Sequence, residues 1–392
     1  MIKKIFILAF MAMFLISCQT GKEDAKKFSD DFQKISGDLK VKRDKVKTRD
    51  EFIAFNEDMK REFEILLKKY EKSPAIEEIE ILRSKILLKV KNLEEAEKKI
   101  DALIATNPGL LAEAKMVKVQ ILFERKKYDE AYNIFKAVEP LVKDVNDLLD
   151  AYYNIGTEHA DNKVKEEYAN KFLNSKQIPE DLAKNKFNAY LTLAEVAKEE
   201  GNIEKAKKLL NDGIADVKDE KSKGVLSKTL EQFDYFGKPA FPISAPTWLN
   251  SSPLKLEELK GKPVVVLFWA PWCTYCRALM PDIVSIYAEN KDKGLTVFGY
   301  TRLYGTYRDD LGDKGKVTKE EEIEYIKNHL ARHDMQFPVA ISEEKTVYDT
   351  YKITGIPTLI FITKKGEINY IKIGGGSIPF IKDKIKTLLL ET

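Results

Sequence analysis

The sequence predicts two folds in succession, an all-α array of helical hairpins followed by an α/β domain. From about Ala25 to residue 235, apolar side chains recur every three or four residues, which is the spacing of one helix face. Short motifs in this region repeat at intervals of 35 to 38 residues. After a proline-rich boundary at residues 236–250, strand-like apolar runs alternate with helical patterns, which favours an α/β layer.

Composition limits the function classes. The chain has 392 residues, enough for two or three domains, with 66 Lys and Arg against 63 Asp and Glu and a net charge of +3. This balance gives no electrostatic reason to expect nucleic acid as a partner. The three cysteines, Cys18, Cys273 and Cys276, are too few for a structural disulfide framework.

The N-terminal sequence predicts an export signal. Two lysines near Met1 precede an apolar run, Ile5 to Ile16, that is too short for a comfortable membrane span. Its end, Leu15-Ile-Ser-Cys18, resembles the lipobox of bacterial lipoproteins. The resemblance implies a signal peptide at residues 1–17, lipidation of Cys18 and a lipid anchor with spacer at residues 18–24. An ordinary secretory signal is the alternative.

The same resemblance implies a location in the cell envelope. Gln19, rather than Asp, follows the lipobox cysteine. By analogy with the enterobacterial sorting rule, we expect a lipid-anchored protein in the outer membrane, facing the periplasm.

Residues 25–235 are predicted to be α-helical. Four motifs, which end in Ala96, Ala131, Ala169 and Ala206, each open a helix, and small residues there let the two helices of a hairpin pack closely. The segment resembles tetratricopeptide repeats, best at Tyr128-Asp-Glu-Ala131. Two roles stay open for this array: a concave surface that binds a partner protein, or a spacer or dimerisation layer.

A linker at residues 236–250, with Gly237 and three prolines, leads into an α/β domain at residues 251–392. After a short strand and turn within Trp248–Leu259, β-branched and aromatic runs predict the main strands, and amphipathic patterns predict the helices. The strands are expected at Val264–Trp269, Leu295–Tyr300, Phe337–Ile341, Thr358–Thr363 and Ile368–Ile373. The helices are expected from the cysteines to Tyr287 and at Glu321–His333, Val347–Lys352 and Phe380–Leu390.

Cys273 and Cys276 are the candidate catalytic residues. Two cysteines two residues apart at the start of a helix can form a reversible disulfide, and the helix N-terminus stabilises Cys273 as a thiolate. Cys273 is therefore the expected nucleophile, and Cys276, inside the first turn, the resolving cysteine. Trp272 would shelter the pair and leave one edge open to a substrate. The alternative, half of a zinc site, lacks two further cysteine ligands, so we predict no metal.

The domain resembles the TlpA/ResA-like branch of extracytoplasmic thiol oxidoreductases in the thioredoxin superfamily. The resemblance rests on Leu256 to Pro263, on Phe268-Trp-Ala-Pro-Trp-Cys273 and on Gly355-Ile-Pro-Thr358. It implies that Pro357 is cis and faces the disulfide, and that the backbone of Ile356 is free to pair with a substrate. Ile356 and Pro357 are thus expected to bind substrate together with Trp272.

Several positions depart from the family pattern. Acidic residues are expected where Leu267 and Leu279 stand, so no proton acceptor for Cys276 is visible. The Thr274-Tyr275 pair between the cysteines leaves the direction of electron flow open. A polar insertion at residues 302–319 could form a lip beside the active site or a plain surface loop. His329 and His333 share a helix face as metal ligands can, but no third ligand is visible, so we interpret the pair as chance.

Together these features predict a membrane-anchored thiol–disulfide oxidoreductase that reduces protein disulfides through Cys273 and Cys276. It would need no cofactor, and a membrane thiol reductant would supply its electrons. The alternatives are an interaction or scaffold lipoprotein whose helical array binds a partner, and a disulfide exchanger that works as an oxidase or isomerase. A peroxidase is disfavoured because the single-cysteine motif of peroxiredoxins is absent.

Overall fold

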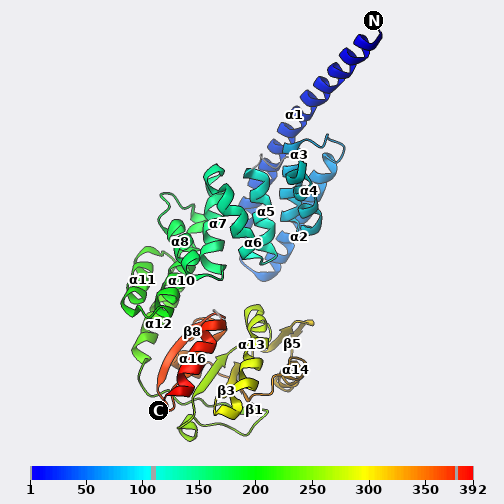
Figure 1. Ribbon diagram of the computed structural model, residues 1–392. Coiled ribbons are helices and arrows are strands. Elements are labelled where there is room, and N and C mark those ends of the chain that lie inside the picture. The colour runs from blue at the N-terminus through cyan, green and yellow to red at the C-terminus, as the bar shows by residue number, and fades with distance from the viewer. Residues whose placement is uncertain (1, 107–111, 376–377, 392) are drawn as a thin grey trace. The chain divides into compact units, whose positions relative to one another are not determined.

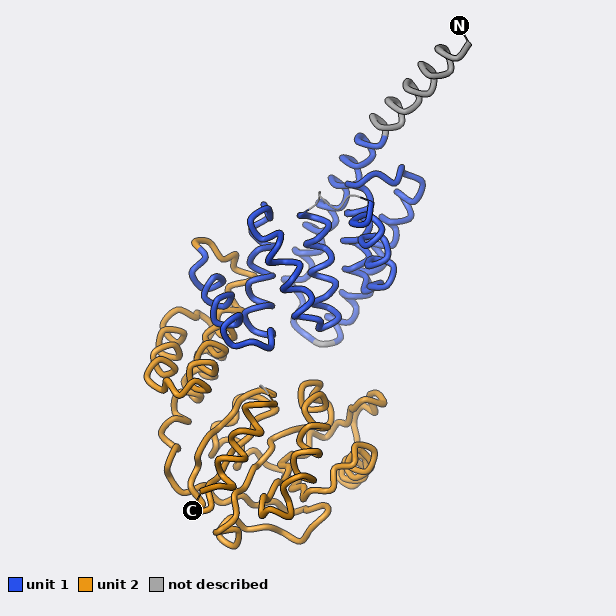
Figure 2. The backbone as a smooth tube through the Cα atoms, viewed as in Figure 1, with its two compact units in different colours: residues 1–175 blue, residues 176–392 orange. Residues whose placement is uncertain are grey.

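The computed structural model describes residues 2–106, 112–375 and 378–391, and side chains from residue 21 onward except that of Arg49. The chain divides into two compact units, residues 1–175 and 176–392 (Figure 2). Both predicted folds are present, a many-helix array followed by an α/β domain with a mixed sheet (Figure 1).

The first unit is an array of helices. Its helices are α1 (Ile2–Arg43), α2 (Arg49–Lys69), α3 (Glu77–Lys89), α4 (Leu93–Thr106), α5 (Ala112–Glu124), α6 (Tyr128–Val138), α7 (Val145–Glu158) and α8 (Asn162–Leu173), with a 3₁₀ turn at Glu139–Leu141. α1 also runs through residues 18–24, where the sequence pattern suggested a polar spacer.

Small residues set the spacing of the hairpins. Ala96, Ala131 and Ala169 have no exposed surface, in agreement with their expected place between paired helices. At Gly156 of α7, a Cβ atom would lie only 2.4 Å from the backbone nitrogen of Ala169 in α8. Apolar clusters run from α1–α3 through α3–α5 to α5–α8, so successive hairpins share one continuous core.

The second unit begins with four further helices. These are α9 (Glu180–Ala183), α10 (Lys186–Glu199), α11 (Ile203–Asp216) and α12 (Glu220–Glu231), followed by a 3₁₀ turn at Gln232–Tyr235. The predicted linker is hydrogen-bonded to the α/β domain. The backbone amides of Gly237 and Ala240 donate to Ile368 and Gly366 at 2.8 Å, so this segment is attached to the sheet.

The α/β domain holds a six-stranded sheet in the order β1-β6-β3-β2-β7-β8. β2, β3 and β6 are parallel, while β1, β7 and β8 are antiparallel to their neighbours. The strands are β1 (Thr247–Leu249), β2 (Val264–Phe268), β3 (Thr296–Arg302), β6 (Val339–Ser342), β7 (Thr358–Ile362) and β8 (Ile368–Ile373). The helices are α13 (Thr274–Asn290), α14 (Lys319–Arg332), α15 (Thr346–Thr350) and α16 (Ile378–Leu390), with 3₁₀ turns at Leu256–Leu259 and Lys291–Lys293.

The central strand β2 is buried on both faces. Val265 and Leu267 enter one apolar cluster with residues of α13, α14 and α16, whereas Val264, Val266 and Phe268 enter the opposite one. This alternation is expected of a strand between two covering layers, and it explains the continuous apolar run in the sequence. The loop after β2 therefore emerges from the most buried part of the domain, which holds the cysteines in place.

The insertion after β3 is not a plain loop. It contains a two-stranded hairpin, β4 (Thr306–Asp309) and β5 (Gly312–Lys316), which precedes α14. α14 begins with a capping box in which Thr318 and Glu321 satisfy each other's backbone amides.

Candidate active site

Cys273 is the N-cap residue of α13. Its Sγ accepts a hydrogen bond from the backbone N–H of Cys276 at 3.1 Å, so the sulfur lies at the positive end of the helix. When the pair is reduced, the same N–H and the helix dipole would stabilise the Cys273 thiolate.

The two cysteines are joined as a disulfide. Their Cα atoms lie 5.2 Å apart, within the range that a disulfide spans without backbone movement. Both cysteines are buried, and Cys273, at 4% exposed against 1% for Cys276, is the more accessible of the two. The assignment of nucleophile and resolving roles stays a prediction.

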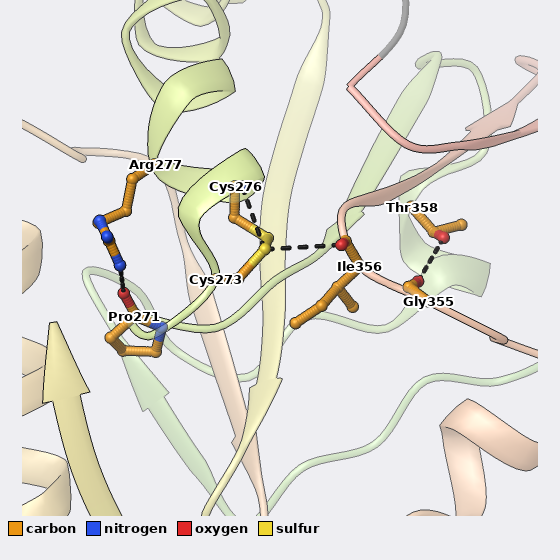
Figure 3. The surroundings of a disulfide bond; sticks show 7 residues. All are labelled: Pro271, Cys273, Cys276, Arg277, Gly355, Ile356 and Thr358. Atoms are coloured by element: carbon orange, nitrogen blue, oxygen red, sulfur yellow. Dashed lines mark hydrogen bonds between the residues drawn. A yellow bond between two sulfur atoms is a disulfide. The ribbon is translucent and has the colours of Figure 1, made fainter. Parts of the chain in front are cut away.

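The Ile356–Pro357 turn faces this disulfide. The peptide bond between the two residues is cis, and the carbonyl oxygen of Ile356 lies 3.5 Å from the Sγ of Cys273 (Figure 3). The hydroxyl of Thr358 donates to the carbonyl of Gly355 at 2.8 Å and closes the turn. The sequence-predicted substrate residues Ile356 and Pro357 are therefore next to the sulfur that would attack a substrate.

Trp272 contacts the start of the insertion. Its ring meets that of Tyr304 edge to face at 5.5 Å, and the guanidinium of Arg302 lies 4.2 Å from the centre of the Tyr304 ring. An aromatic and cationic rim thus borders the partly exposed Trp272 beside Cys273.

Glu322 holds this rim in position, and sequence reasoning missed it. Its carboxylate accepts from the backbone N–H groups of Tyr304 at 2.8 Å and Gly305 at 2.9 Å, and the residue is 2% exposed. Burial raises the pKa of Glu322, while the two N–H donors act to lower it. The capping box of Thr318 and Glu321 was visible in the sequence and could have located the start of the helix that carries Glu322.

The surroundings of Cys276 are apolar, as the departures at Leu267 and Leu279 led us to expect. Both leucines are buried. Within the described part of the chain, neither cysteine forms a hydrogen bond with a carboxylate. Arg277, next to Cys276, instead donates to the carbonyl of Pro271 at 2.8 Å (Figure 3).

The predicted lipidation site lies outside the described side chains, because these begin at residue 21. Across the residues that the structure does cover, no helix is both long enough and apolar enough to cross a bilayer.

Comparison with known proteins identifies relatives of the C-terminal part. The Redoxin family model matches residues 237–388. Thiol-disulfide oxidoreductase ResA of Oceanobacillus iheyensis is 34% identical over 126 residues, which cover 32% of this chain and 57% of that protein. The ResA protein of Bacillus cereus is 31% identical over 132 residues, covering 34% of this chain and 66% of its own. A crystal structure of a thiol-disulfide isomerase from Corynebacterium glutamicum matches at 22% identity with a TM-score of 0.34, over 39% of this chain and 97% of its own. The chain thus spans little more than half the length of the first of these relatives.

Proposed function

We propose that this chain is a thiol–disulfide oxidoreductase that reduces protein disulfides. Its C-terminal part is a ResA-like thioredoxin domain of the Redoxin family, which follows a large all-helical region. The observation that carries the proposal is the Cys273–Cys276 disulfide at a helix N-terminus, with the Ile356 carbonyl 3.5 Å from the Cys273 sulfur. The two relatives named ResA are themselves called thiol-disulfide oxidoreductases, which supports it.

The proposed reaction transfers two electrons. The Cys273 thiolate attacks one sulfur of a substrate disulfide, a mixed disulfide forms, and the other substrate sulfur leaves as a thiolate. Cys276 then loses its proton and attacks the Cys273 sulfur. The second substrate thiolate leaves, and the chain is left with the Cys273–Cys276 disulfide. A thiol reductant, in our proposal one at the membrane, must return two electrons before the next cycle.

The geometry supports specific binding of an extended substrate segment. The carbonyl of Ile356 points at Cys273, where a substrate N–H beside its cysteine could donate to it in a short β-bridge (Figure 3). Trp272 and Tyr304, which meet edge to face, offer aromatic surface to a bound segment on the side of Trp272.

The experiment measures the reduction potential of the Cys273–Cys276 pair and the reduction of a protein disulfide in the same preparation. A potential near about −270 mV would support a reductant, whereas one near about −120 mV would favour the oxidase or isomerase alternative. Cys273→Ser should abolish the reaction, and Cys276→Ser should accumulate the mixed disulfide. Unchanged reduction by Cys273→Ser would exclude the proposed chemistry.

We also propose that the chain is attached to the envelope membrane through lipid on Cys18, on the strength of the Leu15-Ile-Ser-Cys18 motif. Several acyl chains on one residue bind firmly where one would not. Cys18→Ser should release the protein from the membrane fraction while its reduction potential stays unchanged. Retention of the variant in that fraction would refute the anchor.

A pocket in the first unit favours a second function, the binding of a protein partner by the helical array. The pocket contains both charges and apolar side chains, which suits a peptide with mixed character. It is lined by Lys85, Ala112, Glu113, Met116, Leu141, Val142, Lys143, Asp144 and Asp147. Full biological function from a Cys273→Ser, Cys276→Ser double variant would favour this role over the redox one.

A further inference from the structure

Two histidines and one aspartate converge where α14 meets the tip of the β4–β5 hairpin. Asp310 directly follows β4, His329 lies in the last turn of α14, and His333 is its C-cap residue. One ligand atom from each of the three lies within 4.8 Å of the others. We infer that Asp310, His329 and His333 bind a divalent transition-metal ion of the Zn²⁺ class.

The distances fit a single small ion. Nε2 of His333 lies 3.2 Å from Oδ1 of Asp310, and Nδ1 of His329 lies 3.5 Å from the same oxygen. Zinc binds nitrogen and oxygen ligands at about 2.0–2.2 Å, so the ligand atoms of a tetrahedral site lie roughly 3.3–3.5 Å apart. Two of the three edges are therefore within about 0.1 Å of the spacing that the ion requires.

Nδ1 of His329 is buried among three polar groups. The residue is 1% exposed, and its Nδ1 lies 3.4 Å from Arg332, 3.5 Å from Asp310 and 3.6 Å from Asp309. The contact with Arg332 is a long hydrogen bond, so a metal ion bound to this nitrogen would have to replace it.

Arg332 is the competitor for this site. Its guanidinium binds Asp309 and also lies 3.3 Å from Oδ1 of Asp310. Asp309 holds it in place, because that carboxylate is buried and also accepts from Tyr307 and from the backbone N–H of Leu311 at 2.8 Å. The Arg332 side chain is 32% exposed, and ion binding requires it to withdraw from Asp310 and from Nδ1 of His329 while it stays on Asp309.

A bound ion would connect the insertion to the wall of the active site. The His329 ring stacks on that of Trp269 at 5.7 Å, and Trp269 lies four residues before Cys273. The ion would join Asp310 at the hairpin tip to the helix that packs on Trp269. We therefore expect the ion to restrain the β4–β5 hairpin. The first strand of this hairpin begins two residues after Tyr304, which belongs to the rim beside Trp272.

The test uses the full chain with Cys273→Ser and Cys276→Ser, because a reduced cysteine pair binds zinc by itself. Zn²⁺ is titrated in competition with a chromophoric chelator. We expect one ion per chain. In the same background, Asp310→Asn and His333→Gln should each weaken binding at least about tenfold, since the loss of a residue that only hydrogen-bonds to a metal ligand already costs that much. Arg332→Gln should strengthen binding.

The matched control is His159→Gln, which removes the remaining histidine of the chain and should leave Zn²⁺ affinity unchanged. Both ligand variants lie at partly exposed side chains, and thermal unfolding without metal checks that each is folded. A second readout is hydrogen exchange of residues 306–316, which Zn²⁺ should slow in the parent chain but not in His333→Gln. Absence of stoichiometric binding, or equal affinity in the parent and both folded ligand variants, would overturn the proposal.

Discussion

Gly299 is the residue that lets Trp269 pack beneath the active site. A Cβ atom at position 299 of β3 would lie 2.7 Å from Nε1 of Trp269 and 3.4 Å from the Phe337 ring. Trp269 has no exposed surface, and its Nε1 has no hydrogen-bond partner among the described residues. The indole is therefore held in place by packing and not by a hydrogen bond.

We predict that Gly299→Ala destabilises the second unit by about 1–3 kcal/mol, the usual cost of an overpacked core. Urea unfolding followed by tryptophan fluorescence measures it, because all three tryptophans lie in this unit. The control is Gly224→Ala in α12, where nothing lies within 4 Å of the added Cβ. It should be neutral or stabilising by up to about 1 kcal/mol, because alanine favours helix. Equal effects of the two changes would contradict the packing argument.

A substitution at Glu322 tests whether the rim formed by Arg302 and Tyr304 contributes to substrate binding. Glu322→Ala leaves the N–H groups of Tyr304 and Gly305 without their acceptor, so the rim should lose its fixed position. If the proposed function holds, KM for a protein disulfide should rise several-fold, while reduction of a small disulfide stays unchanged. Glu320→Ala, at an exposed position of the same helix, is the control. Parallel losses on both substrates would indicate a general folding defect instead.

At the scale of single elements, α7 carries two carboxylates with opposite effects. Asp144 is its N-cap and accepts from the N–H groups of Asn146 at 2.8 Å and Asp147 at 3.3 Å. Asp150 lies inside the helix, where burial, reinforced by the charge of Asp147, raises its pKa to about 6. The first group should stabilise the helix, and the second should destabilise it whenever it is ionised.

The pH dependence separates these two effects. The pKa of Asp150 is about 6 in the folded chain, against an ordinary value of 3.8. Between pH 3.8 and about 6, Asp150 therefore keeps its proton in the folded chain but loses it in the unfolded chain. The contribution of Asp150 to stability therefore falls as pH rises from about 4 to about 6.

We predict that Asp150→Asn stabilises α7 by about 1–2 kcal/mol at pH 7 and has little effect below pH 4. Asp144→Ala should cost about 1 kcal/mol at pH 7, because it removes the cap. Hydrogen exchange of α7 amides in the full chain measures both. Stabilisation by Asp150→Asn that is the same at pH 4 and pH 7 would refute the assigned cause.

At the scale of the whole molecule, a buried ionic cluster joins the last helices to the α/β domain. Lys372 of β8 contacts Glu199 of α10 at 2.9 Å and Glu195 at 3.5 Å. Lys198 binds Glu195 and donates to the carbonyl of Ile371 at 2.8 Å. These four side chains are at most 10% exposed, so α10 and β8 belong to one compact unit, as the division at residue 175 indicates.

Lys372→Met should destabilise the second unit by about 3–5 kcal/mol, because it leaves two buried glutamates with one cation. Adding Glu199→Gln should recover part of the loss, since it removes the excess negative charge. Lys386→Met on the exposed face of α16 is the control for loss of a lysine. Urea unfolding followed by tryptophan fluorescence and by hydrogen exchange of the α10–α12 amides should change together. Separate transitions would show that α10–α12 and the α/β domain fold independently.

Local patterns predicted most elements closely. β8 has the bounds expected from its apolar run, and β2 and α16 differ from theirs by only one or two residues. The β4–β5 hairpin was missed because its second strand is exposed throughout, so no apolar face marked it. Thr306–Asp309 alternates exposed and buried positions, but one of the two buried residues is the charged Asp309, so the sequence shows no apolar alternation there.

The sequence by itself determined the two fold classes and the chemistry centred on Cys273 and Cys276. Helical periodicity and a cysteine pair after an apolar strand act over a few residues, and neighbours along the chain therefore suffice to recognise them. Only the tertiary structure decided that Asp310 meets His329 and His333, that Glu322 holds Tyr304, and that Lys372 joins Glu199. These contacts connect residues 17 to 173 positions apart, and a side chain gives no local sign of a partner that folding brings to it.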